Sequence, residues 1–312
     1  MSSTRSSLGV KMIWIVLVMV VLAVASFVSG FYVGSVVVED SSFVVVDDYG
    51  RTVKLGGTPE RIVSVAPTPT EILFAVGAGQ QVVGVDNYSD YPAAAVSLPK
   101  VGSFTLNIEA ILALNPDLIV ASDLVPLQQL ELLGDRGIPY IIFADRTLED
   151  IFKTIRLAGV VTGHVDEADQ LASTLTARLE AVTNKTLAVG VSKPTVYVEY
   201  YPMWTYGPGS FGDDLISLAG GENIAHNTST EYPMVTDEFV IAQNPEIIVY
   251  TSGVMSSTTA ETIAARPGWT SIAAISGDDI HSIDDNLLSR YGPRIIDGLE
   301  QLAEILHPEL FS

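Results

Sequence analysis

Two kinds of apolar pattern alternate along the chain. Short runs rich in β-branched residues, with few polar residues between them, are typical of buried strands in a parallel sheet. They occur at 61–67, 82–86, 117–120, 139–143, 194–201, 246–250 and 279–284. Between them lie segments whose apolar residues recur every three to four positions, as in a helix with one buried face. The alternation predicts an α/β fold with central, mostly parallel sheets.

One long stretch, 145–187, has no strand signal. Its apolar residues recur at helical spacing, at Leu171, Leu175, Leu179 and Val182. This pattern predicts one continuous helix, with Gly163 as the only place for a break. A hairpin is predicted at 43–55, before the first parallel strand. We therefore expect an N-terminal α/β lobe, a helical connector and a C-terminal α/β lobe at 43–145, 146–192 and 193–312.

The two predicted lobes share a phrase. NIEAILALNPDLIVAS (107–122) matches TDEFVIAQNPEIIVYTS (236–252), about 130 residues later, too far apart for a solenoid repeat. In each copy a good N-cap residue, Asn107 or Thr236, is followed by Glu near the positive end of a helix. Asn-Pro then ends the helix, because a residue before proline avoids the α region. Two similar lobes in one chain favour a ligand cleft between them.

A second parallel pairs one acid from each lobe. EILFAVGAG (71–79) aligns with DLISLAGGE (214–222), so that Glu71 and Asp214 each precede by six residues the glycine that ends a helix. Each acid is predicted to lie at a helix start, after a strand and a turn.

The N-terminal segment 12–38 has no charged residue. As a helix it would be about 40 Å long, enough to cross a bilayer. It is flanked by two cations before it and two acids after it, Arg5, Lys11, Glu39 and Asp40. The positive-inside rule then predicts a transmembrane helix that leaves 1–11 in the cytoplasm and the lobes outside. A cleaved signal peptide, with 23–25 as the cleavage signal, is the alternative, and it also places the lobes outside the cytoplasm.

Composition excludes several functions. The net charge of −21 argues against nucleic-acid binding, which needs clustered Lys and Arg. The absence of cysteine excludes disulfides, thiol catalysis and a lipid-modified cysteine anchor. The four histidines are scattered without metal-ligand spacing, and no pair of carboxylates stands out for acid–base chemistry. We therefore expect neither an enzyme nor a resident metal or cofactor.

Aromatic residues concentrate in the predicted loops after strands, where open α/β sheets bind ligands. They are Tyr88, Tyr91 and Phe104 in the first lobe, and Tyr200, Tyr201, Trp204, Tyr206, Phe211 and Tyr291 in the second. Large amphipathic rings suit a bulky, partly apolar ligand.

Several motifs resemble one family. DDYGRTVKLGGTPERIVSVAPTPTEILFAVGAG, YSDYP, NPDLIV, SFGDDLISLAGGENIA and YGPRIIDGLEQLAEIL look like the binding proteins that serve ABC importers of vitamin B12, ferric siderophores and haem. The resemblance covers 43 to about 310, and VDNYSDYP and SFTLNIEAI are most similar to the cobalamin-binding members. It implies two α/β lobes bridged by one long helix, a shallow cleft between the lobes, and limited hinge motion.

The resemblance also implies roles for individual residues. One acid on each lobe, Glu71 and either Asp214 or its neighbour Asp213, would pair with arginines on the two permease subunits. Contacts to a corrinoid would come from Tyr88 or Tyr91, Phe104, Tyr201, Trp204 and Asp285. Arg290 is the candidate for an anionic iron chelate.

The expected protein is thus the extracytoplasmic, membrane-tethered receptor of an ABC importer, with two-fold permease subunits and their ATPases as partners. Its expected cargo is a corrinoid, with a ferric siderophore or haem as the alternative. A tethered ligand sensor without transport, and an enzyme that shares the fold, are the alternatives of other classes.

Overall fold

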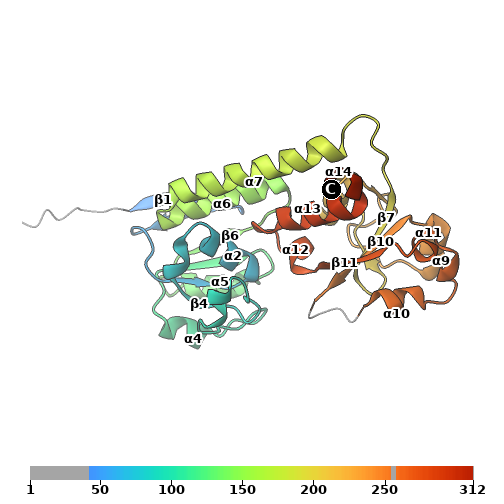
Figure 1. Cartoon of the computed structure of the whole chain (residues 1–312). Coiled ribbons are helices and arrows are strands. Elements are labelled where there is room, and N and C mark those ends of the chain that lie inside the picture. The colour runs from blue at the N-terminus through green and yellow to red at the C-terminus, as the bar shows by residue number, and fades with distance from the viewer. Residues whose placement is uncertain (1–41, 254–257, 312) are drawn as a thin grey trace, which may run out of the picture. The chain divides into compact units, whose positions relative to one another are not determined.

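The computed structural model describes residues 42–253 and 258–311 (Figure 1). The described residues belong to one compact unit that begins at Ser42 and has its own hydrophobic core, as expected of a domain that folds independently. The predicted membrane segment, 12–38, lies outside the described residues. Among the helices that the structure describes, none is long and apolar enough to cross a bilayer.

The N-terminal lobe is built on a four-stranded parallel sheet in the order β4-β3-β5-β6. The strands are β3 (Ile62–Ser64), β4 (Val82–Val85), β5 (Leu118–Ser122) and β6 (Tyr140–Phe143). The predicted hairpin is formed by β1 (Phe43–Val46) and β2 (Thr52–Leu55). The helical segments are α2 (Pro67–Ala75), η1 (Ala78–Gln80), α3 (Ala93–Val96), α4 (Ile108–Ala113) and α5 (Leu127–Gly134).

The connector is helical as predicted, and the break falls at Gly163, the one place where the sequence allowed it, so that two helices replace one continuous helix. They are α6 (Leu148–Thr162) and α7 (Val165–Thr186), which lie side by side (Figure 1). Gly163 ends α6 with φ 79°, a left-handed conformation that costs glycine little. The absence of a side chain at Gly159 lets Ala168 approach α6 closely. Among the described helices, α7, 22 residues long, is the one that runs from the first lobe to the second (Figure 1).

The C-terminal lobe contains a five-stranded sheet in the order β11-β10-β7-β8, with β9 also paired to β7. All pairings are parallel except that of β7 with β8. The strands are β7 (Thr195–Tyr201), β8 (Trp204–Thr205), β9 (Glu222–Asn223), β10 (Ile247–Ser252) and β11 (Ile280–Asp284). The helical segments are α8 (Phe211–Leu218), α9 (Asp237–Gln243), α10 (Ala260–Ala264), η2 (Trp269–Ser271), α11 (Ala273–Ser276), α12 (Asn286–Ser289), α13 (Ile295–Leu306) and α14 (Pro308–Phe311).

The repeated phrase forms the same unit in both lobes, α4–β5 and α9–β10. The predicted N-caps are confirmed: Asn107 accepts a hydrogen bond from the Ala110 amide at 3.0 Å, and Thr236 accepts one from the Phe239 amide at 3.3 Å. The asparagines before the prolines, Asn115 and Asn244, have φ angles of 46° and 47°. Asparagine tolerates this left-handed conformation, so it reverses the chain at the helix end in both copies.

Apolar packing joins the lobes through the connector. One cluster of buried side chains includes Ile62 of the first sheet, Ile155 of α6, Leu175 of α7 and Leu299 of α13. Separate clusters contain Val63 and Ile119 in the first lobe and Tyr197 and Ile248 in the second. Each sheet therefore has side chains in two clusters, as expected for parallel strands buried on both faces.

Candidate functional site

Side chains of both lobes meet at Glu71. Helix α2 begins at Pro67, so Glu71 lies in its second turn rather than at its start as predicted. The side chain of Glu71 is only 2% exposed. Arg290 donates to it from Nη1 to Oε1 at 2.9 Å, and Arg294 donates from Nε to Oε2 at 2.8 Å and from Nη2 to Oε1 at 2.6 Å.

The two arginines make further contacts with the first lobe. Arg290 also donates to Asp90 at 2.7 Å and to the Tyr88 carbonyl at 3.3 Å. The guanidinium of Arg294 lies over the ring of Tyr91, 4.0 Å from its centroid. Arg290 was expected to face an anionic ligand, but its donors are directed at the N-terminal lobe. One face of Tyr91 is likewise covered by a side chain of the C-terminal lobe.

A buried chain of polar groups supports the loop that carries Tyr88. Asp86 accepts hydrogen bonds from the Tyr88 amide, at 2.8 Å, and from the Ser89 hydroxyl. Ser89 in turn lies 2.8 Å from the hydroxyl of Thr70 on α2. Burial raises the pKa of Asp86, and these hydrogen bonds oppose the rise. The loop is therefore fixed from below, although the Tyr88 ring is exposed.

Exposed apolar side chains lie on the loops that follow strands of the first lobe. Tyr88 and Phe104 approach each other, with 6.2 Å between ring centroids. Phe104 is 67% exposed and Leu124, after β5, is 73% exposed. Leu124 was not among the residues expected from the sequence. This lobe therefore brings together Tyr88 and Phe104, two of the predicted ligand contacts.

The second lobe has a matching set of exposed side chains. Tyr201 and Trp204 are paired across the β7–β8 hairpin, and Trp204 forms a further bridge with Met234. Met234 is 65% exposed, and the Tyr232 hydroxyl lies 3.1 Å from that of Tyr291. Tyr206 and Phe211, in contrast, are core residues.

Sequence reasoning missed Tyr232 and Met234, although the repeat contained a signal for them. Phe104 lies three residues before Asn107 in the first copy. Tyr232 and Met234 lie four and two residues before Thr236 in the second copy. The same loop of each lobe therefore carries exposed apolar side chains.

The last expected contact residue, Asp285, lies between β11 and α12. Its Oδ1 atom accepts a hydrogen bond from the Ser289 hydroxyl at 2.9 Å. Its side chain is also close to Gly253, where an added Cβ would lie 3.1 Å from Oδ2. Asp285 therefore stands at the end of its strand but is partly engaged by its own lobe.

The two candidate docking acids of the second lobe are neighbours on helix α8 but lie in different environments. Asp213 is buried. Its Oδ1 atom accepts a hydrogen bond from the side-chain amide of Asn223 at 2.7 Å, and its Oδ2 atom lies 2.8 Å from Nδ1 of His226. Asp214 is exposed, and partial burial together with the charge of Asp213 raises its pKa. Asp214 is therefore the acid that a partner could reach, whereas Asp213 holds its own lobe together.

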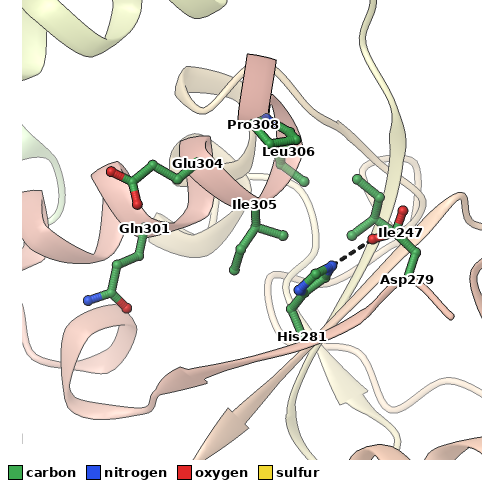
Figure 2. Close-up of a pocket in the computed structure, with 8 residues that line it drawn as sticks. All are labelled: Ile247, Asp279, His281, Gln301, Glu304, Ile305, Leu306 and Pro308. Carbon is green, nitrogen blue, oxygen red and sulfur yellow. Dashed lines mark hydrogen bonds and ion pairs between the residues drawn. The ribbon is translucent and has the colours of Figure 1, made fainter. Parts of the chain in front are cut away.

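A separate hollow of about 500 Å³ lies between the β10–β11 edge and helices α13 and α14 (Figure 2). Ile247, Ile305 and Leu306 contribute its apolar wall, and His281 pairs with Asp279 at 2.6 Å. It contains none of the expected site residues. Across the described ranges, no group of three or more His, Cys, Asp or Glu side chains could hold a metal ion.

The architecture, two α/β lobes bridged by one helix with exposed apolar loops on each, is that of a solute-binding protein. The periplasmic binding protein family matches residues 62–287, so the chain belongs to that family, which confirms the resemblance found in its motifs.

Three similar proteins illustrate the relationship. An uncharacterized ABC transporter substrate-binding lipoprotein of Bacillus subtilis is 31% identical over 278 residues, covering 86% of this chain and 87% of the relative. A vitamin B12-binding protein of Pectobacterium atrosepticum is 30% identical, covering 80% of this chain and 88% of the relative. The structure of a periplasmic heme-binding protein from Roseiflexus has a TM-score of 0.72 and 29% identity, covering 80% of this chain and 99% of that one.

Proposed function

We propose that this chain is the extracytoplasmic substrate-binding component of an ABC importer, and that it captures a corrinoid between its lobes. Membership of the periplasmic binding protein family supports the general role. Similarity to a vitamin B12-binding protein over 80% of the chain supports the ligand class.

The observation that carries the ligand assignment is that Arg290 and Arg294 are already paired with carboxylates of the protein. Arg290 and Arg294 lie beside the loop that carries Tyr88 and Tyr91, and both are neutralised by Glu71 and Asp90, while Lys100 donates to the Ser89 carbonyl of the same loop at 2.7 Å. An anionic ferric chelate would have to displace these carboxylates. The exposed side chains on the loops of the two lobes include aromatic rings, Leu124 and Met234, which suit a bulky ligand without strong negative charge.

Haem is the second candidate. The similar Roseiflexus protein is a heme-binding protein, and exposed tyrosines such as Tyr88 and Tyr201 carry phenol oxygens that can ligate haem iron. A ferric siderophore ranks third, because the charge of Arg290 is already balanced by Glu71 and Asp90.

Delivery to the permease would use one acid from each lobe, Glu71 and Asp214. Asp214 is exposed on α8 and can accept a bidentate arginine as it stands. Glu71 first has to be released from Arg290 and Arg294. The pair would place the two lobes on two permease subunits.

Attachment to the membrane would use the apolar segment 12–38. The B. subtilis relative is a lipoprotein, whereas these 312 residues contain no cysteine that could carry the lipid. An uncleaved transmembrane helix would replace that anchor and keep the lobes outside the cytoplasm.

The test is a ligand comparison on the fragment that begins at Ser42. Cyanocobalamin, haem and a ferric hydroxamate are titrated separately, and dissociation constants are measured by calorimetry. Tight one-to-one binding of cyanocobalamin alone supports the corrinoid assignment. Preference for haem or the iron chelate would replace it, and binding of none of the three would contradict the proposed cargo classes. A sensor would bind ligand equally, but deletion of the permease would leave its signalling unchanged.

A further inference from the structure

We infer that Glu71, Asp90, Arg290 and Arg294 form a latch that holds the two lobes at their present spacing and masks Glu71 from outside partners. The latch itself rests only on the structure. Its consequence for docking rests on the proposed function.

The latch is directed at a single carboxylate. Three donors, one from Arg290 and two from Arg294, reach the two oxygens of Glu71. A carboxylate has about four acceptor positions, so three of them are filled by the protein's own guanidinium groups. With 2% of the Glu71 side chain exposed, an external arginine has almost no access to it.

Both cations come from one turn of the second lobe. Arg290 ends α12 and Arg294 immediately precedes α13, with Gly292 between them. A Cβ added at Gly292 would lie 3.9 Å from Glu71, so the backbone of this turn lies close to α2. Two side chains from one short turn can therefore pair with a residue more than two hundred positions earlier.

Charge balance explains why the latch is stable when closed and why it can be exchanged. Two arginines face two acids, and the side chains of Arg290 and Arg294 are only 12% and 16% exposed. Breaking such a pair leaves a buried carboxylate without a partner, which is strongly unfavourable. Once the internal guanidinium groups have moved away, a permease arginine that takes their place leaves Glu71 paired again at the end of the exchange. Docking at Glu71 would then free the α12–α13 turn and loosen the lobes in the same event.

The chain offers a matched control for this cluster. Arg178 on α7 donates to Asp297 at 2.6 Å and to Glu300 at 2.9 Å on α13. This is also an arginine with two carboxylates, but it ties the connector to the C-terminal lobe rather than one lobe to the other. Arg178→Gln removes a comparable ion pair without opening the latch.

The experiment uses the fragment from Ser42, because it contains the whole compact unit. As the chain has no cysteine, spin labels attach only at two introduced sites, Glu131→Cys on α5 and Thr270→Cys on η2. Both positions are exposed, one in each lobe. Pulsed electron paramagnetic resonance measures their separation in the parent, in Arg290→Gln with Arg294→Gln, in Arg294→Gln alone, and in Arg178→Gln.

We expect a longer or broader separation in the double variant, a smaller change in Arg294→Gln, and none in Arg178→Gln. Masking is read separately, without the spin labels, by labelling with a carbodiimide and glycine ethyl ester followed by mass spectrometry. Labelling of Glu71 should rise several-fold when both arginines are replaced, whereas exposed Asp214 should label equally in all variants.

Unchanged separation together with unchanged labelling of Glu71 would overturn the latch. If the variant with both arginines replaced does not fold, the measurements on Arg294→Gln alone decide whether the latch exists, because Arg290 can still pair with Glu71 in that variant. Neither readout involves cargo or permease. A failed latch is thus distinguishable from a failed assignment of ligand or transport.

Discussion

Arg294 holds Glu71 with two hydrogen bonds, at 2.8 and 2.6 Å, although the residues are 223 positions apart in the chain. Each belongs to a different lobe, so the pair is a tertiary link across the molecule. Because both side chains are largely buried, its rupture should cost stability as well as lobe spacing.

We expect Glu71→Gln and Arg294→Gln each to lower the free energy of unfolding by about 2–4 kcal/mol, because each leaves a buried charge with fewer partners. The variant that combines Glu71→Gln with Arg294→Gln should lose less unfolding free energy than the sum of the two single losses, with a coupling of about 1–3 kcal/mol. Urea unfolding followed by circular dichroism measures all three values. Simple additivity would mean that the two side chains do not stabilise each other.

Asp214 should be needed for delivery but not for binding. Since its carboxylate is exposed on α8, Asp214→Arg is expected to reduce ligand uptake by cells at least about tenfold through repulsion of a permease arginine. The dissociation constant of the purified protein should not change. Glu180→Arg, at an exposed position on α7, is the matched charge reversal. Equal loss of uptake in both variants would show a general charge effect instead of docking.

Trp204 should report ligand binding, and Trp269 should not. They are the two tryptophans of the fragment from Ser42. Trp269 is fully buried and its indole donates to Asp237 at 2.7 Å, whereas Trp204 lies beside exposed Tyr201 and Met234. A corrinoid should quench fluorescence in Trp269→Phe but not in Trp204→Phe.

A contact between Trp204 and the ligand should also contribute to the binding affinity. Trp204→Ala is expected to weaken binding about tenfold or more, as loss of an aromatic contact residue commonly does. If Trp204→Phe keeps the full quench, the ligand lies elsewhere.

Asp145 should make stability depend on pH. Burial raises its pKa to about 7, and the neighbouring charge of Asp48 adds to the rise against the hydrogen bond from Thr154. The Thr154 hydroxyl lies 2.6 Å from Asp145 and 3.0 Å from Asp48, but it has only one proton to share. A protonated carboxyl satisfies both contacts.

The sign follows from proton binding. The pKa of Asp145 is higher in the folded state than in the unfolded state. Between about pH 4 and pH 7 the folded protein therefore binds more protons than the unfolded chain, and its stability falls as the pH rises through that interval. Asp145→Asn should remove the part of this fall that comes from Asp145, and raise stability at pH 8 by about 2–4 kcal/mol. Thermal unfolding from pH 4 to pH 8 tests it. An unchanged pH profile in the variant would assign the dependence to other groups.

Local patterns predicted much of the fold because they depend on neighbours in the chain. The Val- and Ile-rich runs became strands, and Asn107 and Thr236 became N-caps that accept hydrogen bonds from the backbone amides of Ala110 and Phe239. The connector was only partly predictable. Helical spacing continues across 145–187, but the reversal at Gly163 depends on close packing of Gly159 against Ala168, which are nine residues apart.

By itself, the sequence determined the α/β architecture, the duplication of its helix–strand unit and the alignment of Glu71 with Asp214, since all three are written in residue order. Only the tertiary structure decided that these acids differ. Asp214 is exposed on its helix, whereas Glu71 is enclosed by two arginines that the chain brings from the other lobe. The reason is physical: exposure and ion pairing depend on which distant segments fold against a residue, and no local pattern records that.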